Sequence, residues 1–107
     1  MAILICYKNY KLGKLDFDGE TYLYTSLPDS LIFAKKYPFI DFPLAKVQSE
    51  EDTEMPYFFE KFVENLVFNE SMNKLLDINL ERDTYFDVLS KYAKLNQDKN
   101  TFYYELA

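Results

Sequence analysis

The 107-residue chain contains no histidine and only two glycines. Without histidine, His-based acid–base catalysis, Ser-His or Cys-His nucleophilic chemistry and imidazole metal sites are excluded. Two glycines are too few for a dinucleotide-binding GxGxxG motif or a glycine-rich phosphate loop. The run Asp16-Phe17-Asp18-Gly19 contains an Asp-Phe pair next to a glycine, as kinase metal-binding motifs do, but no catalytic loop accompanies it. We interpret it as a hairpin turn, and we expect neither enzymatic activity nor a cofactor.

Basic residues are also scarce. Twelve Lys and Arg face eighteen Asp and Glu, so the net charge is −6, and Arg82 is the sole arginine. Direct recognition of nucleic acid usually needs a clustered basic face, whereas Lys35-Lys36 is the only adjacent basic pair. The composition therefore argues against direct nucleic-acid binding. It favours solubility and a basic protein partner.

The single cysteine, Cys6, has no partner for an internal disulfide. It lies in the apolar run of residues 2–6, where a buried free thiol is expected, and this fits a reducing cytoplasm. The run is too short for a membrane span and lacks the basic start of a signal peptide. We therefore expect a cytoplasmic protein without membrane association.

Length and aromatic content predict one domain that spans residues 1–107. Ten Phe and ten Tyr are available for its core, and each aromatic side chain buries about 150–250 Å². In the first half, patterning predicts strands over residues 2–7, 12–17 and 20–25, with a hairpin at Asp18-Gly19. Pro28-Asp29 indicates a turn, residues 31–34 form a short apolar run, and residues 39–42 lie between two prolines and are expected to be extended.

An acidic loop is expected over residues 49–55. It carries the densest set of carboxylates in the chain: Glu50, Glu51, Asp52 and Glu54. Three interpretations stay open for this set, namely a solvated loop, an electrostatic contact with a basic partner, and a metal site. Because carboxylates are numerous, a carboxylate-dependent hydrolase remains an alternative function.

Helical periodicity dominates the second half. Apolar residues at 58, 59, 62, 63 and 66 predict a helix over 56–67, and similar spacing predicts helices over 70–78 and 84–95. Residues 101–106 return as a strand that we expect to pair with the first sheet. The predicted fold class is α+β: a small antiparallel, partly barrel-like sheet from the N-terminal half and the C-terminal strand, packed with three short helices.

Phe68 occupies a position that is normally polar, because it falls between the first two of these helices. A large apolar side chain in such a turn either folds back onto the core or is left exposed for a partner. Both interpretations stay open. Phe58, Phe59 and Phe62 are expected mainly as core residues.

The order of several short motifs resembles that of the N-terminal subdomain of HipA-type Ser/Thr kinase toxins. The matching segments are Gly13-Lys14-Leu15, Pro43-Leu44, Pro56-Tyr57-Phe58-Phe59 with Asn65-Leu66-Val67, and Asp83-Thr84-Tyr85-Phe86-Asp87-Val88-Leu89. They cover roughly residues 10–106. The Pro-Glu-Gly that usually follows the first helix in that subdomain is replaced here by Phe68-Asn69-Glu70.

Since the sequence stops where the kinase would continue, it is similar to the stand-alone form of this subdomain, the HipS-type proteins of HipBST toxin–antitoxin systems. That resemblance implies an antitoxin that binds and inhibits a separately encoded HipT-like kinase, with a HipB-like helix-turn-helix protein as a further partner. The alternative is a structural subunit that completes and activates the kinase. We place the inhibitory contact at Phe68, Asn69, Glu70, Ser71 and Met72. Secondary contacts are expected from Tyr57, Phe59, Glu50, Glu51, Asp52 and Glu54.

Overall fold

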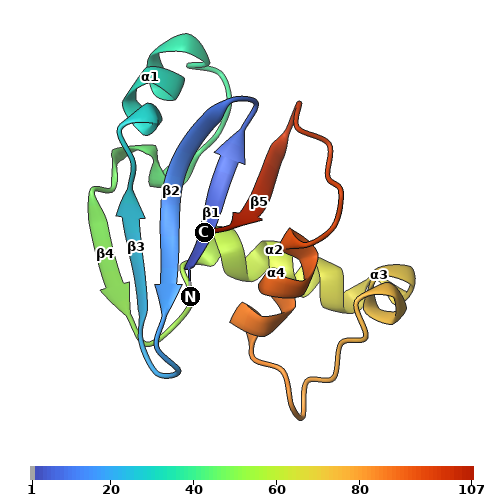
Figure 1. Cartoon of the computed structure of the whole chain (residues 1–107). Helices are drawn as coiled ribbons and strands as arrows, with labels where there is room; N and C mark the ends of the chain where they lie inside the picture. The colour runs from blue at the N-terminus through green and yellow to red at the C-terminus, as the bar shows by residue number, and fades with distance from the viewer. Residues whose placement is uncertain (1) are drawn as a thin grey trace.

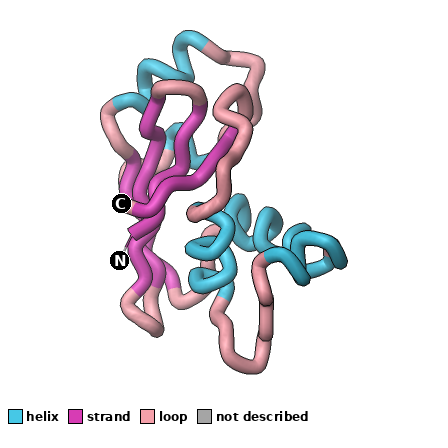
Figure 2. Tube along the Cα trace, turned by 45° about the vertical axis from the view of Figure 1, so that its right-hand side comes forward, coloured by secondary structure: helices cyan, strands magenta, loops and turns pink. Residues whose placement is uncertain are grey.

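The computed structural model describes residues 2–107 and contains an open, five-stranded antiparallel sheet with strand order β4-β3-β2-β1-β5 (Figure 1). Helices α2, α3 and α4 gather on one side of this sheet, while α1 stands at its upper end (Figure 2). The α+β prediction is confirmed. The sheet does not close into a barrel, because β4 and β5 form two separate edges.

The first three strands agree with the sequence patterning: β1 (Ala2–Tyr7), β2 (Tyr10–Phe17) and β3 (Tyr22–Ser26). The turn between β2 and β3 is held by the Asp18 carboxylate, which accepts the backbone N–H groups of Glu20 at 2.9 Å and Thr21 at 2.8 Å. Gly19 has a φ of 102°, a conformation that glycine adopts without steric cost. The Asp-Gly pair therefore fixes this hairpin, as predicted.

Gly13 is required by close packing. A Cβ at this position would stand 2.1 Å from the hydroxyl oxygen of Tyr24 and 2.4 Å from its Cζ. The β1–β2 register shifts next to it, between Ile5 and Cys6. The absent side chain thus leaves room for the Tyr24 ring, which is fully buried.

The C-terminal strand, β5 (Phe102–Leu106), pairs antiparallel with β1, as expected from the sequence. Its outer edge is occupied by Gln97. The Gln97 side chain accepts the Tyr104 N–H at 2.9 Å and donates to the Tyr104 carbonyl at 2.8 Å. At Tyr104, one side chain therefore replaces the backbone pairing that an edge strand leaves unmet.

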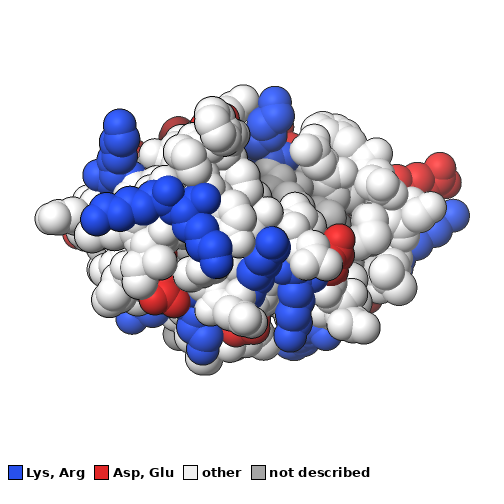
Figure 3. Space-filling model, turned by 90° about the horizontal axis from the view of Figure 1, so that it is seen from above, with Lys and Arg blue, Asp and Glu red and all other residues white. Residues whose placement is uncertain are grey.

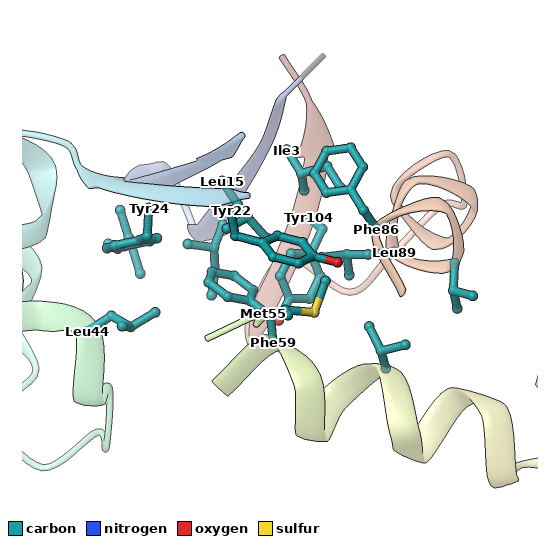
Figure 4. Packing of buried hydrophobic residues seen from close by; sticks show 14 of the residues in the cluster. Ile3, Leu15, Tyr22, Tyr24, Leu44, Met55, Phe59, Phe86, Leu89 and Tyr104 are labelled. Atoms are coloured by element: carbon teal, nitrogen blue, oxygen red, sulfur yellow. The ribbon is translucent and has the colours of Figure 1, made fainter. Parts of the chain in front are cut away.

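Three of the helices follow the predicted pattern with shifted ends: α2 (Tyr57–Phe68), α3 (Glu70–Leu75) and α4 (Tyr85–Ala93). A capping box between Thr84 and Asp87 starts α4, and each side chain accepts the other residue's backbone N–H. The core lies between the sheet and these helices, with buried aromatics at its centre (Figure 4). Labelled members include Ile3, Leu15, Tyr22, Tyr24, Leu44, Met55, Phe59, Phe86, Leu89 and Tyr104.

Two segments differ from the expectation. Pro28 lies in a turn, as predicted, but the apolar run of residues 31–34 belongs to a helix, α1 (Asp29–Lys36), which buries Ser30 and Phe33 one turn apart. Residues 39–42 form no strand: the Ile40 N–H donates to the Tyr37 carbonyl in a turn, and Phe42 is extended. A short 3₁₀ helix, η1 (Pro43–Lys46), follows. The acidic loop is also wrong in part: Ser49–Asp52 is strand β4, which pairs with β3 along its length. Between residues 2 and 107, no helix combines the length and apolar character needed to cross a membrane.

Candidate protein-docking surface

Helix α2 presents two unlike faces. Its solvent side carries Tyr57, Lys61, Asn65 and Phe68, all exposed and spaced by three or four residues along one stripe. Tyr57 is 70% exposed and Phe68 is 84% exposed. At a rise of 1.5 Å per residue these two rings mark the ends of a stripe about 16 Å long. We call these four residues the α2 stripe.

The opposite face of α2 belongs to the core. Phe59, Val63 and Leu66 are buried, and Phe59 retains only 1% of its exposure. The Phe59 ring contacts Tyr24 and Tyr104, with centroids 5.8 Å and 6.1 Å away. Phe59 was expected as a secondary partner contact, and that expectation is wrong because no partner atom can reach it without unfolding the core.

The junction between α2 and α3 holds Phe68 in an ordered setting. Asn69 ends α2 and starts α3: its N–H donates to the carbonyls of Asn65 and Leu66, and its side chain accepts the Met72 N–H at 3.0 Å. The Asn73 amide donates to the Val67 carbonyl at 3.0 Å and closes the corner. Phe68 therefore projects from a braced corner and takes no part in the core.

The other predicted contact residues lie on the same corner. Glu70 and Ser71 are exposed in the first turn of α3, and Met72 is half-buried against the core cluster. Leu75, in the last turn of α3, is another exposed apolar side chain that the sequence did not single out. Its position three residues after Met72 places both side chains on the same face of α3, which the sequence alone could have indicated. Leu75 extends the apolar corner that begins at Phe68.

A groove of about 740 Å³ runs beside the α2 stripe. Its lining includes Tyr57, Lys61 and Asn65 of α2 and Pro43, Leu44 and Val47 in and just after η1. The remaining lining residues are five aromatics and four others: Phe58, Phe62, Tyr92, Phe102, Tyr104, Asp41, Glu50, Pro56 and Thr101. Sequence reasoning missed this groove, because its lining comes from segments far apart in the chain.

The rings along the groove brace one another. Phe58 packs edge-on against Phe102 with centroids 5.5 Å apart, and Phe62 lies 4.9 Å from Tyr104 and 5.0 Å from Tyr92. The Phe58–Phe102 and Phe62–Tyr92 pairs meet edge to face and the Phe62–Tyr104 pair is tilted, and aromatic pairs of this kind are favourable beyond the buried area alone. The groove is thus a preformed, largely apolar surface next to the α2 stripe.

The four carboxylates of the acidic segment do not face one way. Successive side chains of a strand point to opposite faces, so Glu50 and Asp52 share one face of β4 and Glu51 takes the other. Glu50 borders the groove beside α2, whereas Glu51 lies near Asp16 and Asp18. Glu54 follows in the turn after β4, where its N–H donates to the Asp52 carboxylate at 3.1 Å.

The buried ionisable side chains of Cys6, Tyr24 and Tyr104 are part of the packed interior and stay uncharged. Burial, with a smaller contribution from Glu105, raises the pKa of the Cys6 thiol to about 11, so the thiol stays protonated. Burial also raises the pKa of Tyr24 to about 12 and that of Tyr104 well above its usual range. Within residues 2–107, no group of three or more His, Cys, Asp or Glu side chains is placed to hold a metal ion.

The chain matches no known family model and no curated protein. The α2 stripe with an exposed ring at each end, the apolar corner at α3 and the preformed groove lie along one helix, an arrangement suited to binding a macromolecule. Apolar side chains exposed together in this way are typical of protein-interaction sites.

Proposed function

We propose that this protein is an antitoxin that binds and inhibits a separately encoded HipA-like Ser/Thr kinase of the HipT type. The motifs that resemble the N-terminal subdomain of HipA-type kinases support the choice of partner. Gly13 of the first motif leaves the space that the Tyr24 ring fills in the sheet, and Thr84 and Asp87 of the last motif cap α4. Proteins that share this fold would need these residues for the same structural roles.

The observation that carries the proposal is the exposure of Phe68 on a braced corner. A phenylalanine that contributes nothing to the core, at the end of α2 beside a corner held by Asn69 and Asn73, is suited to anchor a partner. Burying it in a kinase pocket would contribute about 1.5–3 kcal/mol, which corresponds to roughly ten- to hundredfold in affinity.

The α2 stripe and the neighbouring groove would supply the rest of the contact. Stable protein–protein interfaces bury about 1,600 Å² in total, more than one corner provides. Tyr57 stands at the far end of the stripe, with Lys61 6.0 Å from its ring centroid. A kinase lobe seated along α2 would meet Tyr57 and Phe68 together.

Co-expression with a HipT-type kinase tests the proposal and separates it from the alternative of an activating subunit. Growth arrest and kinase autophosphorylation are measured with and without this protein. The proposal predicts a stable complex, relief of growth arrest and reduced autophosphorylation. Increased autophosphorylation in a stable complex would favour the activating subunit, and an unchanged kinase would contradict both.

A further inference from the structure

Three segments that are distant in sequence bring four lysines to one end of the molecule. Lys8 lies in the β1–β2 turn, Lys35 and Lys36 end α1, and Lys99 lies in the loop before β5. These segments meet at the upper end of the fold (Figure 1). Viewed from that end, basic side chains extend over more of the visible surface than the carboxylates scattered among them (Figure 3). We call these four residues the lysine end.

Backbone and side-chain contacts join the segments of the lysine end. The Lys8 N–H donates to the Lys99 carbonyl at 3.0 Å, which joins the turn to the loop. The ammonium groups of Lys8 and Lys36 lie 5.2 Å and 5.7 Å from the centroid of the same ring, that of Tyr37. All four lysine side chains are exposed.

Tyrosines hold these ammonium groups in place. Lys36 lies 5.7 Å from the Tyr10 ring centroid and donates to the Tyr10 hydroxyl at 3.1 Å, and Lys99 lies 5.7 Å from the Tyr103 centroid. Cation–π contacts restrict long flexible side chains while leaving their charge accessible. The hydrogen bond to Tyr10 also raises the pKa of Lys36, so its charge is kept across the physiological range.

Two carboxylates lie near the four lysines. Asp98 precedes Lys99 and accepts the Asn100 N–H at 2.9 Å, and Asp29, at the start of α1, accepts the Lys11 N–H at 3.3 Å. The carboxyl end of α1 adds a partial negative charge, which Lys35 and Lys36 in its last turn exceed. A chain of net charge −6 therefore concentrates positive charge on one end.

The sequence argues against direct nucleic-acid binding because it shows only one adjacent basic pair, but the fold gathers four exposed lysines at one end. We propose that the lysine end contacts the phosphate backbone of double-stranded nucleic acid without reading its sequence. Charge complementarity supports this partner: four exposed ammonium groups face a polyanion whose phosphates recur along both strands, and lysine binds phosphate as a point charge. The Tyr10 hydroxyl beside Lys36 is a group of the kind that contacts phosphate oxygens. This inference does not rest on the kinase proposal.

A labelled DNA duplex titrated with the protein at about 20 mM salt, followed by fluorescence anisotropy, tests the proposal. We expect saturable binding with a slope of log K against log salt of about −0.9 for each phosphate contact. The variant Lys8→Gln/Lys36→Gln/Lys99→Gln should lose at least about tenfold in affinity, and its slope should be shallower by about 2.7.

Two matched variants complete the experiment. Lys14→Gln/Lys74→Gln/Lys94→Gln removes as many lysines elsewhere on the surface, so it controls for net charge. Lys8→Arg/Lys36→Arg/Lys99→Arg keeps the charge of the lysine end. Both should bind the duplex within about twofold of the unmodified protein under these low-salt conditions. Absent binding at low salt, equal losses in the two glutamine triples, or displacement of the duplex by polyglutamate at equal charge would overturn the proposal.

Discussion

Phe59 and Phe68 belong to the same helix, yet they occupy opposite environments. Phe59 is 1% exposed and lies between Tyr24 and Tyr104, whereas Phe68 is 84% exposed at the corner with α3. The difference comes from helical geometry, because nine residues advance the chain by two and a half turns. One side of α2 therefore builds the core and the other presents a surface.

This contrast places a core face and the proposed binding face within the twelve residues of α2. Substitutions on the buried side of α2 should act on stability, and substitutions on the α2 stripe should act on partner affinity. A protein whose binding residues contribute little to its core can vary them without unfolding. The following predictions test whether the two faces are independent, beginning with the largest expected effect.

Phe59→Ala should lower the free energy of unfolding by about 3–5 kcal/mol, because it leaves a cavity beneath Tyr24 and Tyr104. Urea denaturation followed by circular dichroism measures the change. A loss below about 1 kcal/mol would mean that the core closes without this ring, and the division between the two faces of α2 would fail.

Gly13→Ala tests how tightly the sheet packs in the core that the buried face of α2 also contacts. Its methyl group would meet the Tyr24 ring, which in turn packs against Phe59 with centroids 5.8 Å apart. Overpacking of this kind costs about 1–3 kcal/mol, and the melting temperature should fall accordingly. Gly19→Ala is the comparison: nothing lies within 4 Å of its Cβ position, so any loss there reflects backbone strain at φ 102°. Equal tolerance at Gly13 would contradict the close packing.

The sequence predicts much of the buried side and less of the surface. The run of residues 2–7, the Asp18-Gly19 turn and the 3.6-residue spacing in 56–67 carry local signals strong enough to define β1, the first hairpin and α2. Strand β4 carries no such signal. Its Ser-Glu-Glu-Asp sequence lacks apolar alternation, and it is a strand because β3 offers an unpaired edge.

The sequence predicted neither helix α1 nor the lysine end, and the reasons are related. In α1, only Ser30 and Phe33 are buried, so no apolar stripe reveals the helix, and Pro28 indicates a turn. Lys8, Lys36 and Lys99 become neighbours only through tertiary contacts around Tyr37 and the Lys8–Lys99 hydrogen bond. Phe68 was recognised as unusual from sequence, but its exposure depends on the corner that Asn69 and Asn73 build.

Neutralising the acidic residues should change the rate of partner association. In Glu50→Gln/Glu51→Gln/Asp52→Asn/Glu54→Gln, we expect association with the kinase to slow several-fold at low salt while dissociation stays nearly constant, because exposed charges steer encounter. Stopped-flow or surface-plasmon measurements over a salt series provide the test. If the rate does not change at low salt, these residues are ordinary solvated carboxylates.

The smallest effect is expected for the loop that leads from α3 to α4. Lys91 donates to the Asp83 carboxylate at 2.8 Å, and this hydrogen bond, with the Asn79 N–H, lowers the pKa of Asp83 to about 2. A lowered pKa in the folded state stabilises the protein above about pH 4, and the stabilisation is lost as pH falls from about 4 to about 2. Asp83→Asn should flatten the melting-temperature profile in that interval. A profile as steep as that of the unmodified protein would remove Asp83 from this role.

The most direct test compares Phe68→Ala with Phe39→Ala, since both remove an exposed phenylalanine and Phe39 is 98% exposed in the loop after α1. For each variant, calorimetric titration gives the affinity for the HipT-type kinase, and a thermal melt gives stability. We predict that both variants melt within a few degrees of the unmodified protein, that Phe68→Ala loses ten- to hundredfold in affinity, and that Phe39→Ala keeps it. Full affinity in Phe68→Ala, or a large fall in its melting temperature, would contradict the separation of a binding face from a folding face on α2.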